Sequence, residues 1–577
     1  MSEERSKVLQ MLADGKISVE EAERLLKALG NGDRPRRRGK WPRVKWGQVG
    51  DLGNQVAVEW EELEGEVRDQ FDRARRTVRA SMPGVRRTVR DAIPDVDHLV
   101  DEAFAAIPDL GEALNDMGRT ISEAFAEAGE VDDERDYAFT FEHNLSEQAP
   151  LAPGERLALR NLRGSIQVKT WDRDEVRVEL RTVTGAHDEE TAKNCARRVG
   201  LSLDRAEGAL RVEAQGSGTV NEGPARVTCH FVVRVHPKVS LDLRNARGEV
   251  DVASLEADAT IDARHGRTTL QGIGGDTVLR QRHGEADLRQ LGGGLTLDAH
   301  HSKVSVKSVG GPANLRLQHS PAKVRRVEGS LELSGGHGPV SIRRVRGAAR
   351  VRVRHSPLEA EGLRAGLSVD GSHSPMTISG VAEDLQLTTS HGPVKLDEVG
   401  GGAVVRASHA PVTASAVGGK LVVRSSRSPL KASAVGGGAM VRSDHGPVEL
   451  REVAGDVALR SSGGRTLLLE PGAEVTVQGQ RGDVEIRWER PVGSPCTVQC
   501  SRGNVHLRVP RESSLEVLGH VDRGRAATDL PLEVAANSRG GHTVSGHLGA
   551  GGSPLQIEVD RGHLSLMETA EAAGESR

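Results

Sequence analysis

The sequence predicts a mainly β fold, a single-stranded β-solenoid of 18-residue coils that follows an α-helical N-terminal region. Three observations predict the solenoid. One pattern returns at a constant interval across 247–464 without an insertion or a deletion, apolar residues alternate with polar ones inside each repeat, and glycine-rich turns separate the alternating runs. Period-two alternation between such turns is typical of short strands that bury one face.

Residues 391–408, HGPVKLDEVGGGAVVRAS, show the pattern in one repeat. His391-Gly392-Pro393 predicts a turn, because Gly tolerates positive φ and Pro has no N–H to give to a strand ladder. A second turn at 400–402 divides the repeat into two alternating runs. No single repeat could bury an apolar face alone, so the coils must stack on one another. Eighteen extended residues give a coil with a perimeter of roughly 60 Å.

Other repeat architectures fit less well. The density of Gly and Pro would break every helix of a helical repeat, and a propeller blade needs about 40–45 residues. Left-handed β-helices follow a six-residue rhythm, but the buried positions of this repeat do not fall every six residues. This spacing favours a right-handed coil.

The first 51 residues predict a small helical unit and a linker. Residues 1–30 read as a helical hairpin, in which Ser18 and Glu21 form a capping box for the second helix. Residues 31–51 are basic and contain two tryptophans, which is typical of a linker but also compatible with a membrane or nucleic-acid contact.

Residues 52–136 predict amphipathic helices. Apolar residues in the first part recur at spacings of three and four, which places them on one helical face. They are Val56, Trp60, Leu63, Val67, Phe71, Ala74 and Val78. We expect this face to pack against another helix or another copy of the chain; a helix lying on a membrane surface is the alternative.

The remaining chain is predicted to be β-rich. Residues 137–246, with a short helix at 187–200, would cap the N-terminal end of the solenoid, and 247–464 form its regular coils. Residues 465–567 would form irregular rungs and a C-terminal cap. Residues 568–577 are expected to be a disordered tail.

Composition bounds the class of protein. The net charge of the 577 residues is −4, and no aromatic residue lies between Phe231 and Trp488. The four cysteines are too few for a disulfide framework: Cys195 and Cys229 could pair, although isolated thiols fit better, and CTVQC at 496–500 lacks the second pair of a zinc site. The sequence shows neither a signal-peptide pattern nor an apolar run long enough to span a membrane, which predicts a cytoplasmic protein, with association at a membrane surface as an option.

Two stretches resemble known bacterial families. KVLQMLADGKISVEEAERLLKAL at 7–29 resembles the SHOCT-like helical hairpin that heads LiaX- and YvlB-type proteins. Residues 137–567 resemble the candidate-adhesin β-strand-repeat family, through LRNLRGSIQVKTWDRDEVRVE from Leu159, VRVHPKVSLDLRNARGEV ending at Val250 and RGNVHLRVP from Arg502. The resemblance implies a link to cell-envelope stress and a membrane-proximal or surface location. It defines no catalytic residue, and the histidine column described next departs from it.

A column of histidines marks the turn of almost every repeat. It consists of His265, His283, His301, His319, His337, His355, His373, His391, His409 and His445. Equivalent residues of neighbouring coils lie about 4.8 Å apart, so their rings should stack into a ladder along one edge. We expect the ladder to shield the turn. The alternative is a metal-binding ridge for Zn, Cu or Ni, although no carboxylate or thiolate shares the position.

A second column carries arginines, Arg406, Arg424, Arg442 and Arg460, preceded by Arg280, Arg316 and Arg352. Such a stripe could bind a polyanion, but stacked cations usually find counter-charges or solvent. Nucleic acid is not the expected ligand, because the repeats offer no aromatic residues for base stacking.

These features predict a non-enzymatic, adhesin-like scaffold that needs no cofactor. His-Ser pairs such as His319-Ser320 and His355-Ser356 arise from the repetition, whereas a catalytic set needs unequal, individually placed groups. The expected partners are another protein or a second copy, bound through the N-terminal helices, with a peripheral membrane contact as a further option. The alternatives are a metal- or polyanion-binding module and a self-assembling β-helix rod.

Overall fold

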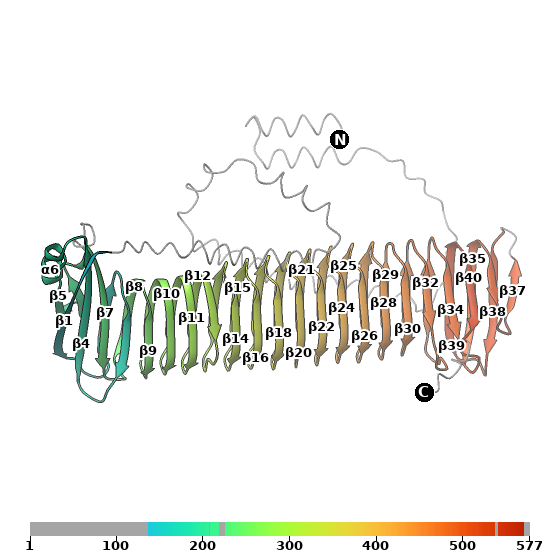
Figure 1. Ribbon diagram of the computed structural model, residues 1–577. Coiled ribbons are helices and arrows are strands. Elements are labelled where there is room, and N and C mark those ends of the chain that lie inside the picture. Colours follow the sequence, from blue (N-terminus) through green and yellow to red (C-terminus); the bar gives the residue numbers. More distant parts are fainter. Residues whose placement is uncertain (1–136, 207, 219–224, 537–539, 570–577) are drawn as a thin grey trace, which may run out of the picture. The chain divides into compact units, whose positions relative to one another are not determined.

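The computed structural model describes residues 137–206, 208–218, 225–536 and 540–569 (Figure 1). Contacts divide the chain into two units, 1–124 and 125–577, and every described residue belongs to the second unit. The predictions for 1–30, 31–51 and 52–136 therefore lie outside the described residues, as does the tail from residue 570.

The described chain confirms the β-solenoid. Each regular coil contains two six-residue strands, and each strand pairs in parallel with its counterpart one coil later. Val405 lies opposite Val423, and Val412 lies opposite Leu430, so the register equals the 18-residue repeat. We call the set of positions that share one place in the repeat a slot. Because the register never slips, every slot of the regular coils becomes a straight column of side chains.

The two strands of each coil build two parallel sheets (Figure 1). The odd-strand sheet contains β13 (Ala313–Gln318), β15 (Leu331–Gly336), β17 (Ala349–Arg354), β19 (Leu367–Ser372), β21 (Leu385–Ser390), β23 (Ala403–Ser408), β25 (Leu421–Ser426), β27 (Ala439–Asp444), β29 (Val457–Ser461), β31 (Val475–Gly479) and β33 (Cys496–Cys500). The even-strand sheet contains β14 (Ala322–Val327), β16 (Val340–Val345), β18 (Leu358–Leu363), β20 (Met376–Val381), β22 (Val394–Val399), β24 (Val412–Val417), β26 (Leu430–Val435), β28 (Val448–Val453), β30 (Thr466–Pro471), β32 (Val484–Arg487) and β34 (Val505–Val509).

Alternating Val, Leu and Ala side chains fill the space between the two sheets. Val405 and Leu396 are completely buried, as are most of their equivalents in neighbouring coils. The even strands break the strict alternation, because their fifth residue has positive φ: 54° at Glu398 and 54° at Ala416. This bend places two consecutive residues outside before the sixth residue, Val399, returns to the core.

Antiparallel strands close the N-terminal end. Strand β2 (Arg156–Asn161) lies between β6 (Ala209–Gln215) and β8 (Ser240–Arg247), and β3 (Ile166–Thr170) lies between β7 (Arg226–Val235) and β9 (Val250–Leu255). Outside them, β1 (Phe139–Pro150), β4 (Glu175–Ala186) and β7 pair antiparallel, as do β5 (Gly200–Ala206) and β6. Helix α6 (Glu189–Arg197) falls inside the predicted helical stretch. Three long strands, β10 (Ala259–Ile273), β11 (Thr277–Leu291) and β12 (Leu295–Val306), lead into the regular coils.

The C-terminal end closes by a return of the chain. Strands β39 (Ser553–Arg561) and β40 (Leu564–Glu568) pair with β33 and β34, so that Cys496 lies opposite Leu555 and Val505 opposite Leu564. Strands β35 (Leu515–Arg523) and β36 (Ala526–Thr528) lie on their other side, and β35 and β37 (Glu533–Ala536) pair antiparallel with β38 (His542–Leu548). Both ends of the parallel ladder are thus covered by strands of the same chain.

Candidate functional site

The histidine column forms the predicted ladder. Nine rings, from His265 to His409, stack in sequence with centroids 4.7–5.2 Å apart and planes within 15° of parallel. Arg427 continues the column, with its Nη1 3.3 Å from His409 Nε2. The imidazoles are exposed along one edge of the solenoid.

The backbone explains why histidine suits this slot. His283 to His409, and His445, have φ of 50–59°, the left-handed region that non-glycine residues seldom adopt. Histidine is one of the few residue types enriched there. The following residue is often Gly at a tight approach: a Cβ on Gly266 would lie 2.2 Å from the carbonyl oxygen of Gly248. The histidines of the column therefore serve first of all to form the turn between the two strands of each coil.

The stack lowers the pKa of alternate rings. Burial, followed by repulsion from neighbouring imidazoles, lowers the pKa of His283, His319 and His355 below the usual value. For His283 the nearby cations Arg282 and His300 act in the same direction. The folded protein therefore favours the neutral form of these three rings.

The serines that precede and follow the histidines differ: Ser372 and Ser408 lie 3.0 and 3.1 Å from Nδ1 of the next residue, His373 and His409, whereas the serines that follow a histidine bond to the backbone. Ser320 and Ser356 are buried, and their hydroxyls donate to the carbonyl oxygens of Gln318 and Arg354 at 2.7 and 2.9 Å. Ser356 Oγ also accepts the N–H of Gly338 on the preceding coil at 3.3 Å. The two hydroxyls thus bond to backbone groups, and Ser356 links two neighbouring coils.

The arginine column divides into two parts. In the N-terminal part its slot alternates in sign, so that Arg280 lies between Asp262 and Asp298, and Asp298 also neighbours Arg316. In the C-terminal part Arg406, Arg424, Arg442 and Arg460 occupy four successive strands with no acidic residue in the slot between them. Acidic neighbours within the slot itself thus occur only in the first part, and binding of a polyanion by the second stays a prediction.

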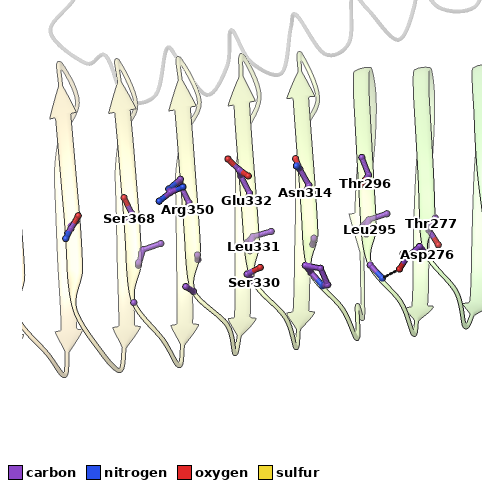
Figure 2. Close-up of a pocket in the computed structure, with 18 of the residues that line it drawn as sticks. Asp276, Thr277, Leu295, Thr296, Asn314, Ser330, Leu331, Glu332, Arg350 and Ser368 are labelled. Atoms are coloured by element: carbon purple, nitrogen blue, oxygen red, sulfur yellow. Dashed lines mark hydrogen bonds between the residues drawn. The ribbon is translucent and has the colours of Figure 1, made fainter. Parts of the chain in front are cut away.

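A groove of about 780 Å³ runs along the odd-strand sheet, as Figure 2 shows. Three adjacent slots line it over seven successive coils, from Asp276 to Asp384. Ser330, Leu331 and Glu332 represent the three slots on β15 and the turn before it. At one end the Asp276 carboxylate accepts the N–H of Gly294 at 2.7 Å. Sequence reasoning missed this groove, because its walls are formed by slots that look unremarkable in a single repeat.

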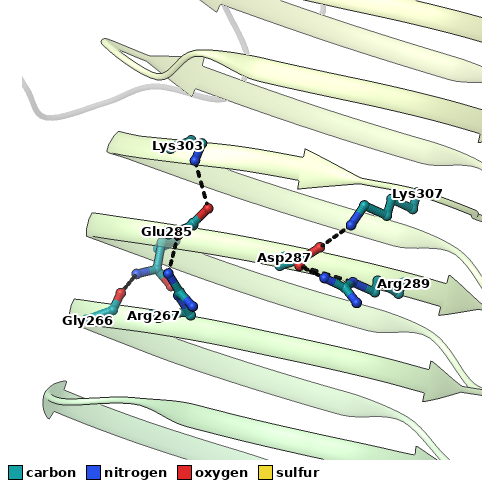
Figure 3. A network of polar contacts seen from close by, with 8 residues as sticks. Gly266, Arg267, Glu285, Asp287, Arg289, Lys303 and Lys307 are labelled. Carbon is teal, nitrogen blue, oxygen red and sulfur yellow. Dashed lines mark hydrogen bonds and ion pairs between the residues drawn. The ribbon is translucent and has the colours of Figure 1, made fainter. Parts of the chain in front are cut away.

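On the first coils of the opposite face, two carboxylates pair with four cations (Figure 3). Glu285 accepts from Arg267 at 2.9 Å and from Lys303 at 3.0 Å, and Asp287 binds Arg289 and lies 3.6 Å from Lys307 Nζ. The Lys303 hydrogen bond is the main cause that lowers the pKa of Glu285, and the Arg289 hydrogen bond does the same for Asp287. Each of these two carboxylates thus forms ion pairs with two cations.

Burial shields three of the four cysteines, Cys229, Cys496 and Cys500. All four are free thiols, and burial raises the pKa of Cys229 and of Cys496 to about 12. Cys496 and Cys500 are both buried on β33, on the same face of the strand, as their even spacing predicts.

Within the described ranges, no group of three or more His, Cys, Asp or Glu residues is arranged to hold a metal ion, so metal binding by the ladder stays a prediction. The same ranges contain no helix long and apolar enough to cross a membrane.

Comparison with known proteins identifies the N-terminal segment only. Residues 3–34 match the SHOCT-like domain family, which confirms that part of the resemblance. No curated protein matches the chain in sequence.

Two solved structures are similar over a large share of their length. A candidate cell-adhesion protein from Clostridium sporogenes is 6% identical, with 74% of this chain and 100% of that chain covered and a TM-score of 0.12. A candidate adhesin from Parabacteroides distasonis is 12% identical; the match covers 60% of this chain and 97% of that chain, with a TM-score of 0.14. Likenesses this weak say nothing about what the chain binds.

Proposed function

We propose that the chain is a non-enzymatic, adhesin-like scaffold that presents long, straight binding surfaces to an elongated partner. The groove of the odd-strand sheet carries this proposal, because the same three slots line it over seven coils. Catalysis needs unequal groups placed one by one, whereas a surface that repeats every coil suits a partner that is itself extended.

The groove has the dimensions of a protein element. Six intervals of about 4.8 Å give it a length of about 29 Å. An α-helix of about 19 residues spans the same length at about 1.5 Å per residue. Polar residues such as Thr296, Asn314 and Ser368 lie along it, whereas the leucines of the middle slot are buried in the core, so the groove offers a partner mainly hydrogen bonds. An elongated protein segment is therefore the partner that the groove suits best.

We further propose that the predicted apolar face of 52–78 holds the scaffold at the cell envelope. The proposal draws on the resemblance to envelope-stress proteins and on the matched SHOCT-like segment. Full-length protein should sediment with membranes from native cells, whereas Trp60→Glu combined with Phe71→Glu should leave most of it in the supernatant, because two charges on an apolar face oppose its burial.

Glu62→Gln combined with Asp69→Asn is the control, since both residues would lie opposite Trp60 on the predicted helix, with its 3.6 residues per turn. This control should sediment like the unmodified chain. If the unmodified protein itself remains in the supernatant, attachment through this face is wrong and a scaffold free of the envelope replaces it.

A further inference from the structure

We propose that a basic cleft on the even-strand sheet binds an oligophosphate, a short chain of linked phosphate groups. The cleft lies over β14, β16 and β18, on the opposite sheet from the groove and from the arginine column. It has a volume of about 490 Å³, and its basic lining residues are Lys307, Arg325, Arg326, Arg343 and Arg344. The proposal is independent of the scaffold function.

The register of the sheet builds the cleft. Arg325 lies directly opposite Arg343 on the next strand, and Arg326 and Arg344 occupy the following slot with φ of 58° and 61°. In that slot the next coil has Gly362, and a Cβ there would come no nearer than 3.9 Å to Arg344. The missing side chain leaves a hollow beside two pairs of guanidinium groups.

Three of these cations have no counter-charge. Arg343 is held by Glu359 at 2.9 Å and Glu361 at 3.3 Å, and Lys307 belongs to the network of Asp287. Arg325, Arg326 and Arg344 are exposed and make no ion pair with any residue of the described ranges. In the preceding coils each of the four cations named above has a carboxylate partner, whereas about three positive charges of the cleft have none among the described residues.

The chemistry of the lining points to phosphate. A guanidinium group offers a rigid fork of donors that matches an oxyanion with two parallel hydrogen bonds, which explains why arginine outnumbers lysine here. Forks on adjacent strands lie about 4.8 Å apart. The two oxygens of a carboxylate are both used by one guanidinium group. A terminal phosphate has three acceptor oxygens, so it can accept hydrogen bonds from the guanidinium groups of two adjacent strands.

The number of charges favours more than one phosphate. Three uncompensated cations match the charge of an oligophosphate better than that of a single phosphate. No aromatic residue lies between Phe231 and Trp488, so the cleft offers no platform for a base. We therefore expect recognition through the phosphates alone, with the same affinity whether or not a nucleoside is attached.

Calorimetric titration of the full-length protein with inorganic tripolyphosphate at about 0.1 M salt tests the proposal. We expect saturable binding of one tripolyphosphate per chain, at least tenfold tighter than that of orthophosphate. ATP should bind no more tightly than tripolyphosphate. Absence of saturable binding would overturn the proposal, and so would ATP binding tenfold tighter, because that would mean that the base is recognised.

Matched variants locate the site. Arg325→Gln, Arg326→Gln and Arg344→Gln together should weaken binding about 100-fold; Gln is compatible with the strained slot, since Gln290 occupies it with φ of 54°. Arg481→Gln, Arg508→Gln and Arg523→Gln remove the same charge from exposed positions outside both the cleft and the arginine column, and should change affinity less than threefold. Equal loss in both triple variants would show diffuse electrostatic attraction and overturn the cleft. An unchanged melting temperature verifies that each variant is folded.

Discussion

Lowering the pH from 8 to 5.5 is expected to lower the melting temperature of the full-length protein, by on the order of 5 °C. His283, His319 and His355 have pKa values below the usual one in the folded chain. At pH 8 the rings are neutral in both states. As the pH falls below about 6.5, the unfolded chain takes up protons that the stacked rings resist.

The sign follows from this difference in proton binding. The free energy of unfolding is highest above the unfolded pKa and decreases as the pH falls towards the lower pKa of the folded rings. The paired carboxylates Glu285 and Asp287 also have lowered pKa values, but their contribution is lost only below about pH 4.5. A lower limit of pH 5.5 therefore isolates the histidines.

Asparagine substitutions separate the ladder from the other histidines. His283→Asn, His319→Asn and His355→Asn together interrupt six of the eight stacked contacts, and asparagine tolerates the left-handed backbone. The triple variant should lose most of the pH dependence. His506→Asn, an exposed position on β34 outside the ladder, should retain it. A melting temperature of the unmodified protein that does not change between pH 8 and 5.5 would refute the effect.

Gly266→Ala is expected to destabilise its coils by about 3 kcal/mol or more. Gly266 has φ of 137°, and an added Cβ would lie 2.2 Å from the carbonyl oxygen of Gly248 and 2.7 Å from its carbon. Both atoms are backbone of the turn between β8 and β9, and Gly248 N–H donates to the carbonyl oxygen of His265, so neither atom can move without disturbing the contact between these turns. Faster amide hydrogen exchange in β8 to β11, together with a lower melting temperature, would reveal the loss.

Gly336→Ala is the control for this substitution. Gly336 ends β15, and nothing lies within 4 Å of a Cβ built there. Its exchange rates and melting temperature should stay within experimental error of the unmodified protein. If Gly266→Ala behaves equally well, the close stacking of the turns is wrong.

Most of the regular fold could be predicted from the sequence, because an unbroken repeat carries its own register. Val405 marks a slot that is apolar throughout the repeats, Val394 marks one that is apolar in nearly all of them, and both residues are buried. The bend in the even strands could not be predicted, since residues as different as Glu398, Ala416 and Gly362 adopt it. The return of β39 between β33 and β35 was also hidden, because a pairing between distant, non-repeating segments leaves no periodic signal.

The candidate sites were predictable to different degrees. The stacking of His265 to His409 follows from identical slots alone, and the structure confirms it. The basic cleft left a trace in the sequence, the Arg-Arg pairs at 325–326 and 343–344, which are one repeat apart. Their lack of counter-charges depends on which carboxylates reach them, and Glu359 and Glu361 turn to Arg343 instead. Which arginine pairs with Glu359 and Glu361 depends on side-chain geometry, which the repeat pattern alone does not give.

Engineered disulfides test most directly the claim on which every surface described above depends, that residues of one slot lie side by side. Glu332 and Arg350 are exposed and directly opposite each other on β15 and β17, and parallel neighbours of this kind fall within the Cα separation that a disulfide needs, about 4.4–6.8 Å. Glu332→Cys with Arg350→Cys should form an intramolecular disulfide on mild oxidation, detected by peptide mass spectrometry. Glu332→Cys with Glu359→Cys, which places the second thiol on the even-strand sheet, should not. Equal cross-linking of the two pairs, or cross-linking of the second pair alone, would contradict the 18-residue coil.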